Sequence, residues 1–218
     1  MSPKRRFLSF ERPRRRMVDE QLIPAGISDV RVLQAMNVVP RHLFVDDALL
    51  GHAYQDSSLP IGGGQTISQP FMVARMSELL SLEGHERVLE IGTGCGYQTA
   101  VLSCLCRRVY SIERIAILHE KARKNLRQAH LANVMLKCGD GLLGWEEYAP
   151  FDAVIVTAGG FASDVWMDQL REGGVLLMPE GEKGSHRLVR RKKLKEGIEE
   201  EYFDACTFVP LLEGELRH

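Results

Sequence analysis

Five short apolar runs, separated by stretches long enough for a helix, dominate the chain between residues 87 and 178. Several are apolar on both faces, which is typical of strands buried in a parallel sheet that helices cover. Parallel neighbours need a crossover connection, usually a helix, and the spacing leaves room for one. The sequence therefore predicts a doubly wound α/β sheet. Its predicted strands are Arg87–Ile91, Val109–Ile112, Val134–Cys138, Ala153–Val156 and Val175–Met178.

The tail has a different pattern. Residues 187–195 are strongly basic, a turn signal follows at Lys195-Glu196-Gly197, and Glu199-Glu200-Glu201 opens an acidic stretch that ends near Pro210. Such a basic run could bind nucleic acid, but an acidic neighbouring strand would satisfy the same charges. We therefore expect an antiparallel hairpin here.

The N-terminal third is predicted to be helical. Its first sixteen residues are basic, including Arg12-Pro13-Arg14-Arg15-Arg16, and we expect them to be frayed or weakly helical. Short helices should follow from Val18 to Leu50, with breaks at Pro24-Ala25-Gly26 and Pro40. Residues 59–64 are rich in Gly and Pro and predict an irregular loop, after which Pro70 opens a helix.

Composition restricts the possible partners and the compartment. The formal net charge of -1 gives no long-range field that would attract nucleic acid or an anionic membrane. The five cysteines are odd in number and lack a Cys-x-x-Cys pair, and no apolar stretch reaches the 18 or so residues that span a bilayer. The seven histidines, His42 and His52 among them, stand outside ligand spacing, so we expect no metal. These features predict a cytoplasmic protein without a nucleic-acid or membrane partner.

A glycine-rich loop follows the first predicted strand. Residues 88–97 read Val-Leu-Glu-Ile-Gly-Thr-Gly-Cys-Gly-Tyr, so a strand, three glycines and a helix start come in succession. Glycines let the backbone approach a ligand at the N-terminus of a helix. A dinucleotide site prefers Gly-x-Gly-x-x-Gly, whereas this loop has Gly92-x-Gly94-x-Gly96. Glu90 would also repel a pyrophosphate and would tolerate a sulfonium amino acid. Dinucleotide binding remains the alternative.

Two further acids follow the next predicted strands. Glu113 lies about twenty residues beyond the glycine loop, where a carboxylate can bind a ribose diol. Asp140 stands between Gly139 and Gly141, where it could accept a hydrogen bond from an exocyclic amine. Three acids at three successive strand ends suggest one ligand. The alternative is that they cap helices and turns.

Two motifs resemble known proteins. The Glu90-x-Gly-x-Gly-x-Gly pattern resembles motif I of class I S-adenosylmethionine-dependent methyltransferases. The stretch Gly64-Gln65-Thr66-Ile67-Ser68-Gln69-Pro70, preceded by Leu59-Pro60-Ile61-Gly62, resembles the signature of the protein-L-isoaspartate O-methyltransferases. The resemblance extends from about Met17 to Leu211, and its other matches include Arg41-His42-Leu43-Phe44, Phe151-Asp152-Ala153 and Phe208-Val209-Pro210-Leu211.

The resemblance implies a fold and an activity. The fold would be a mostly parallel seven-stranded sheet with a C-terminal antiparallel hairpin. The domains would be a poorly ordered basic arm (1–16), a helical subdomain with the substrate loop (17–83) and a cofactor-binding domain (84–218). Such a protein transfers a methyl group from S-adenosylmethionine to the free α-carboxylate of L-isoaspartyl residues in damaged proteins, leaving S-adenosylhomocysteine. A carboxylate is ionised at pH 7, so no general base is needed. We expect a monomer.

The resemblance also assigns residues. Ser68 would orient the substrate carboxylate as the active-site residue, unless it only caps the following helix. Leu59, Pro60 and Ile61 would contact substrate. The cofactor would be bound by Thr66, Ile67, Glu90, Gly92, Thr93, Gly94, Gly96, Glu113, Asp140 and Gly141. The chain departs from the family at Ala158-Gly159-Gly160-Phe161, where an Ala/Pro-rich turn is usual. A class I methyltransferase acting on another carboxylate or small molecule remains the second interpretation.

Overall fold

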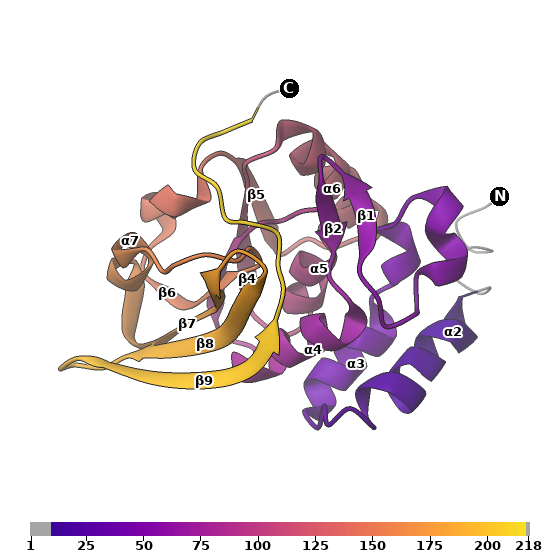
Figure 1. The fold of residues 1–218 in the computed structure, drawn as a ribbon, viewed down its shortest axis with the longest axis horizontal. Helices are drawn as coiled ribbons and strands as arrows, with labels where there is room; N and C mark the ends of the chain where they lie inside the picture. The colour runs from indigo at the N-terminus through magenta and orange to yellow at the C-terminus, as the bar shows by residue number, and fades with distance from the viewer. Residues whose placement is uncertain (1–9, 217–218) are drawn as a thin grey trace.

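The computed structural model describes residues 10–216 of the chain and is built around one seven-stranded sheet (Figure 1). The strand order is β5-β4-β3-β6-β7-β8-β9, in which β5 to β7 pair in parallel and β8 and β9 pair antiparallel. The predicted sheet and hairpin are therefore confirmed. The strands are β3 (Arg87–Ile91), β4 (Arg108–Glu113), β5 (Val134–Cys138), β6 (Phe151–Val156), β7 (Leu170–Glu182), β8 (Ser185–Lys193) and β9 (Ile198–Cys206).

The two faces of the sheet are covered differently. Alternate residues of the central strands pack on opposite sides, so Val88 belongs to one core cluster and Leu89 to the other. The larger cluster contains α4 (Pro70–Leu79), α5 (Tyr97–Ser103), α6 (Ala116–Gln128) and the N-terminal helices. The smaller one lies under α7 (Asp164–Asp168) and the 3-10 turns η4 (Gly141–Leu143) and η5 (Glu146–Tyr148), and aromatic side chains fill much of it.

The N-terminal segment forms short helices that share the main core. They are α2 (Glu11–Arg16), the π-helical η1 (Met17–Leu22), α3 (Val30–Val38), and the 3-10 turns η2 (Arg41–Leu43) and η3 (Asp47–His52). Met17 and Met36 are fully buried in the cluster that includes Val88 of the sheet. Residues 17–83 and 84–216 are thus parts of one core. Within the described residues 10–216, no helix is both long and apolar enough to cross a membrane.

The basic arm is helical where the structure describes it. Residues 1–9 lie outside the described residues, whereas Glu11–Arg16 form a helix that runs directly into η1. Phe10, which precedes this helix, stacks on His42 with ring centroids 4.3 Å apart. This aromatic contact gives the arm a tertiary attachment that its charged composition does not reveal.

Residues 59–67 also differ from the expected loop. They form a hairpin of β1 (Leu59–Gly62) and β2 (Gln65–Ile67), because Leu59 and Ile61 alternate inward while Pro60 faces solvent on an edge strand. Gly63 and Gly64 have φ of 60° and 70°, as a two-residue hairpin turn of this hand requires. The glycines and proline that suggested irregular structure are those that such a hairpin tolerates. The hairpin leads directly into α4 (Figure 1).

The C-terminal hairpin pairs opposite charges as expected. Arg190 lies opposite Glu201 and Arg191 opposite Glu200, with ion-pair distances of 2.6 and 2.5 Å. β9 ends at Cys206, earlier than the predicted end near Pro210. Residues 207–216, which we call the C-terminal strap, then run back over the carboxyl edge of the sheet (Figure 1).

Candidate active site

A pocket of about 880 Å³ of empty space opens at the carboxyl ends of the central parallel strands. This is the edge where open α/β sheets bind ligands. The glycine loop forms its floor: Gly92 has φ of 100°, and a Cβ there would lie 2.4 Å from Thr157 Oγ1. Gly94 has φ of 56°. Seven of the predicted cofactor residues meet in this lining, namely Thr66, Ile67, Gly92, Thr93, Gly94, Glu113 and Gly141.

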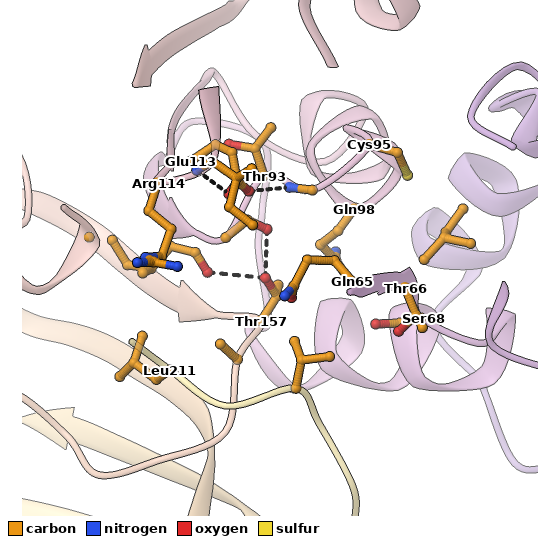
Figure 2. A pocket seen from close by; sticks show the side chains of 18 of the residues that line it. Gln65, Thr66, Ser68, Thr93, Cys95, Gln98, Glu113, Arg114, Thr157 and Leu211 are labelled. Atoms are coloured by element: carbon orange, nitrogen blue, oxygen red, sulfur yellow. Dashed lines mark hydrogen bonds between the residues drawn. The ribbon is translucent and has the colours of Figure 1, made fainter. Parts of the chain in front are cut away.

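Glu113 lies in the pocket wall, and backbone N–H groups hold its carboxylate. Oε2 accepts from Gly94 N at 2.7 Å and Oε1 accepts from Ile115 N at 2.9 Å, as the dashed lines of Figure 2 show. Burial raises the pKa of this carboxyl. A carboxylate has about four lone-pair sites, so two remain for a ligand diol. The same side chain therefore fixes the glycine loop and can accept hydrogen bonds from a ligand.

Glu90 is placed differently from its predicted role. Its side chain is fully buried and absent from the pocket lining, and Oε2 accepts from Thr99 Oγ1 at 2.5 Å and Ser111 Oγ at 2.6 Å. Oε1 has no hydrogen-bond partner among the described residues. Its expected contact with a cofactor stays a prediction. Glu90 instead joins β3, β4 and α5 behind the glycine loop.

The environment of Glu90 predicts a pH-dependent stability. Burial raises its pKa to about 7 from an ordinary 4.5, so between these values the folded protein holds a proton that the unfolded chain has released. The free energy of unfolding should therefore fall as pH rises through this window. Glu90→Gln removes this loss, and its stability relative to the native protein should rise by up to about 3 kcal/mol between pH 4.5 and 8. Urea unfolding of both proteins at pH 4.5 and pH 8 measures this change in relative stability. An equal difference in the free energy of unfolding at the two pH values would contradict the prediction.

Asp140 is also displaced from its predicted role. Its Oδ1 accepts from Leu142 N at 2.9 Å and its Oδ2 from Gly214 N at 2.7 Å, so it caps η4 and holds the C-terminal strap. The carboxylate lies outside the pocket lining, whereas Gly141 is within it. The expected hydrogen bond to an exocyclic amine stays a prediction. Gly214 is 74 residues away in the chain, so no local pattern could reveal this partner.

A second pocket adjoins the first across a common wall. Four residues line both, and three of them carry hydroxyl groups: Thr66, Ser68, Thr157 and Val209. Thr157 Oγ1 contacts the carbonyl oxygens of Ile91 at 3.0 Å and Gly92 at 2.6 Å, so its proton is already engaged. Within residues 10–216, the Ser68 hydroxyl makes no hydrogen bond and does not cap α4, whose N-cap is Gln69. Figure 2 shows Thr66 and Ser68 side by side in this wall.

The remaining predicted residues have supporting positions. Leu59 and Ile61 are buried and Pro60 is exposed, and all three lie outside both pocket linings. They build the hairpin that carries Thr66, and the expectation that they contact substrate stays a prediction. Gly96, with φ of 93°, turns the chain into α5 and also lies outside the linings.

Several pocket residues had no role assigned from sequence. Gln98 and Arg114 line the first pocket, and so do the strap residues Val209 to Leu212. Arg114 Nε donates to Gly214 O at 3.0 Å, so its guanidinium also holds the strap. The available signal was the resemblance of Phe208-Val209-Pro210-Leu211 to the family, although the predicted strand ended near Pro210.

A possible cation-binding cluster lies at the opposite edge of the sheet. Oxygen and nitrogen atoms of Glu83, His85 and Glu86 fall within 4.8 Å of one another just before β3. Glu86 uses both oxygens to accept from Glu83 N at 2.7 Å and Gly84 N at 2.8 Å, which makes it a turn cap. The cluster therefore has a structural explanation, and the expectation of no metal stays a prediction.

The fold and the site together define a class of protein. The protein has the features of a class I S-adenosylmethionine-dependent methyltransferase. They are a seven-stranded sheet of this strand order, a glycine loop after β3 and a carboxylate at the end of β4. Residues 13–216 match the model of the protein-L-isoaspartate(D-aspartate) O-methyltransferase (PCMT) family. The chain belongs to this family.

Relatives agree over nearly the whole length. A protein-L-isoaspartate O-methyltransferase 1 of Pelobacter propionicus is 51% identical over 210 residues, covering 94% of this chain and 98% of that protein. One from Trichlorobacter lovleyi is 50% identical over 94% of this chain and 95% of that protein. A solved protein-L-isoaspartate O-methyltransferase has a TM-score of 0.82 at 31% identity, covering 90% of this chain and 65% of that chain. A putative one from Plasmodium falciparum, in complex with S-adenosyl-L-homocysteine, has a TM-score of 0.77 at 25% identity and covers 91% and 98%.

Proposed function

We propose that the protein methylates the free α-carboxylate of L-isoaspartyl residues in damaged proteins and peptides, using S-adenosylmethionine. The observation that carries this is the wall between two pockets, where Ser68 faces both the glycine-loop pocket and its neighbour. Cofactor and substrate must meet at such a wall for direct transfer. When bound, S-adenosylmethionine supplies an electrophilic methyl group, and the positive φ of Gly92 and Gly94 lets the backbone pass close to it.

Ser68 is the group best placed to orient the substrate. Its hydroxyl is free to donate, whereas the proton of Thr157 is already committed to backbone carbonyls. The carboxylate nucleophile is ionised at neutral pH and needs no base, so the site has to position it and exclude water. A hydrogen bond from Ser68 to the spectator oxygen would leave the other oxygen to attack. Thr66 adds a second hydroxyl on the same segment.

Cys95 lines the same pocket without competing as a methyl acceptor. Burial raises the pKa of its thiol to about 11, so it stays protonated at neutral pH. The thiolate, not the thiol, is the effective nucleophile. The pocket therefore presents a substrate carboxylate as the methyl acceptor in preference to its own sulfur.

Peptide discrimination tests the function directly. With labelled S-adenosylmethionine, a peptide containing L-isoaspartate should be methylated at least about 100-fold faster than the same peptide with normal aspartate. The expectation rests on positioning, which can contribute about 7–11 kcal/mol when geometry is correct. Label that appears equally in both peptides, or in neither, would contradict the proposal. Transfer to a small carboxylate alone would favour the second interpretation, a class I methyltransferase with a small-molecule substrate.

We further infer that the protein acts in the cytoplasm as a monomer, with isoaspartyl proteins as substrates and no nucleic-acid partner. No disulfide joins any of the five cysteines, all of which lie within residues 10–216, and this suits a reducing compartment. The basic tail strand is neutralised by its acidic neighbour, which removes the main candidate for nucleic-acid binding. Light scattering of the purified protein measures its oligomeric state.

A further inference from the structure

The C-terminal strap is held in two separate places. Toward the first pocket it is tied by Gly214 N to Asp140, by Arg114 to two strap carbonyls, and by Leu216 N to Arg114 O at 2.7 Å. Toward the second pocket, Phe208 N donates to His186 Nδ1 at 3.3 Å, and Thr207 Oγ1 reaches Gly184 O at 3.4 Å. Thr207 and Phe208, which line the second pocket, are thus held by longer hydrogen bonds than the residues near the first pocket.

Gly159 joins the two parts. It follows β6, and its N donates to Val209 O while its O accepts from Leu211 N, both at 2.8 Å. Val209 is the strap residue that lines both pockets. The position of Gly159 therefore sets the position of the wall between them.

His186 packs directly against Gly159. A Cβ at position 159 would lie 2.3 Å from His186 Nε2 and 2.4 Å from Cε1, so the imidazole occupies the space of the missing side chain. The ring is only 5% exposed and projects from β8. Because Nδ1 accepts from Phe208 N, the proton of the neutral ring resides on Nε2. One side chain thus contacts both anchors, Gly159 and the Phe208 amide.

We propose that His186 is a positioning residue for the methyl-accepting peptide. It holds Phe208 through a hydrogen bond, and it holds Val209 indirectly by packing on Gly159. The strap can then form the substrate side of the common wall. The turn at residues 158–161 is then matched to His186, since a residue larger than glycine at 159 would displace the ring. The inference rests on the proposed function and identifies a substrate-positioning element outside the signature motifs.

Kinetics of His186 variants test this role. His186→Ala should raise the KM for an isoaspartyl peptide about 10-fold, because one hydrogen bond and the packing of the ring are lost. The kcat should change less than about threefold. Affinity for S-adenosylmethionine should also change less than about threefold, because the first pocket has its own anchors. His186→Asn places an amide oxygen where Nδ1 was and should recover most of the KM. His85→Ala, a histidine change at the opposite edge of the sheet, is the control.

A double-mutant cycle tests the contact between His186 and Gly159. Gly159→Ala alone should raise the peptide KM about as much as His186→Ala, because the new Cβ displaces the ring. In the His186→Ala background the same change should add less than about twofold, since residues that act as a unit are not additive. Independent, multiplying effects would overturn the proposed coupling. An unchanged KM in His186→Ala would overturn the positioning role.

Hydrogen exchange separates this proposal from the proposed function. The amides of residues 207–209 and of Leu211 should exchange faster in His186→Ala than in the native protein, and those of residues 214–216 should not, whatever the substrate proves to be. If the native protein fails to methylate isoaspartyl peptides, the proposed function is contradicted. The exchange rates alone then test whether His186 holds the strap. Unchanged exchange at residues 207–209 and Leu211 would then overturn the role of His186.

Discussion

Gly92→Ala should weaken the binding of S-adenosylmethionine at least about 100-fold, because the floor of the pocket has no room for a side chain. The new Cβ would lie 2.4 Å from Thr157 Oγ1, which bonds to the Gly92 carbonyl itself at 2.6 Å. Relief therefore requires the loop or β6 to move. Titration calorimetry with S-adenosylmethionine measures the loss.

Gly26→Ala provides a matched control. Gly26 has φ of 98°, nearly that of Gly92, but a Cβ there meets nothing within 4 Å. Both variants should lose about 1–2 kcal/mol of stability from the left-handed backbone, while only Gly92→Ala loses the ligand. Gly94→Val should also abolish binding, because valine would collide with Ile61, which already lies 3.3 Å from the Cβ position. Native affinity in both loop variants would show that the ligand binds elsewhere.

Ser68→Ala should lower kcat for an isoaspartyl peptide about 10- to 100-fold, the value of a hydrogen bond to a charged group. Affinity for S-adenosylmethionine should stay within about threefold, since the glycine loop and Glu113 are untouched. Ser68 lines both pockets and its hydroxyl has no partner within residues 10–216. Initial rates and calorimetry on the same preparation give both quantities.

Ser57→Ala is the control for this change. Ser57 is half-buried like Ser68, and it lies just before β1 and outside both pocket linings. The change to alanine removes the same hydroxyl group there. It should leave kcat nearly unchanged. A native rate in Ser68→Ala would instead assign the orienting role to Thr66, the other hydroxyl of that segment.

Local patterns predicted most of the fold because burial acts on each strand separately. β3 and β5 have the predicted bounds, and the charged hairpin pairs Arg190 with Glu201 as expected. The prediction was wrong for residues 59–64, where Gly and Pro suggested a loop. There a primed turn at Gly63-Gly64 gives an ordered hairpin, and only pairing with β2 distinguishes the two.

The candidate site was predicted where a residue acts through its backbone or through its neighbours in the chain. Gly92 and Gly94 belong to this group, because a positive φ is a local requirement. Glu113 does too, since its carboxylate binds the backbone of the loop that faces it. Glu90 and Asp140 have the same chemistry and similar strand-end positions, yet their carboxylates point elsewhere.

The sequence by itself determined the five parallel strands of the sheet, the glycine loop and the family, because each is encoded by short-range spacing and residue type. Only the tertiary structure decided which acids face the pocket. It turned Glu90 toward Ser111 and Asp140 toward Gly214, and it placed His186 against Gly159. These partners are 21 to 74 residues apart in the first two cases, so their contacts depend on how distant segments pack.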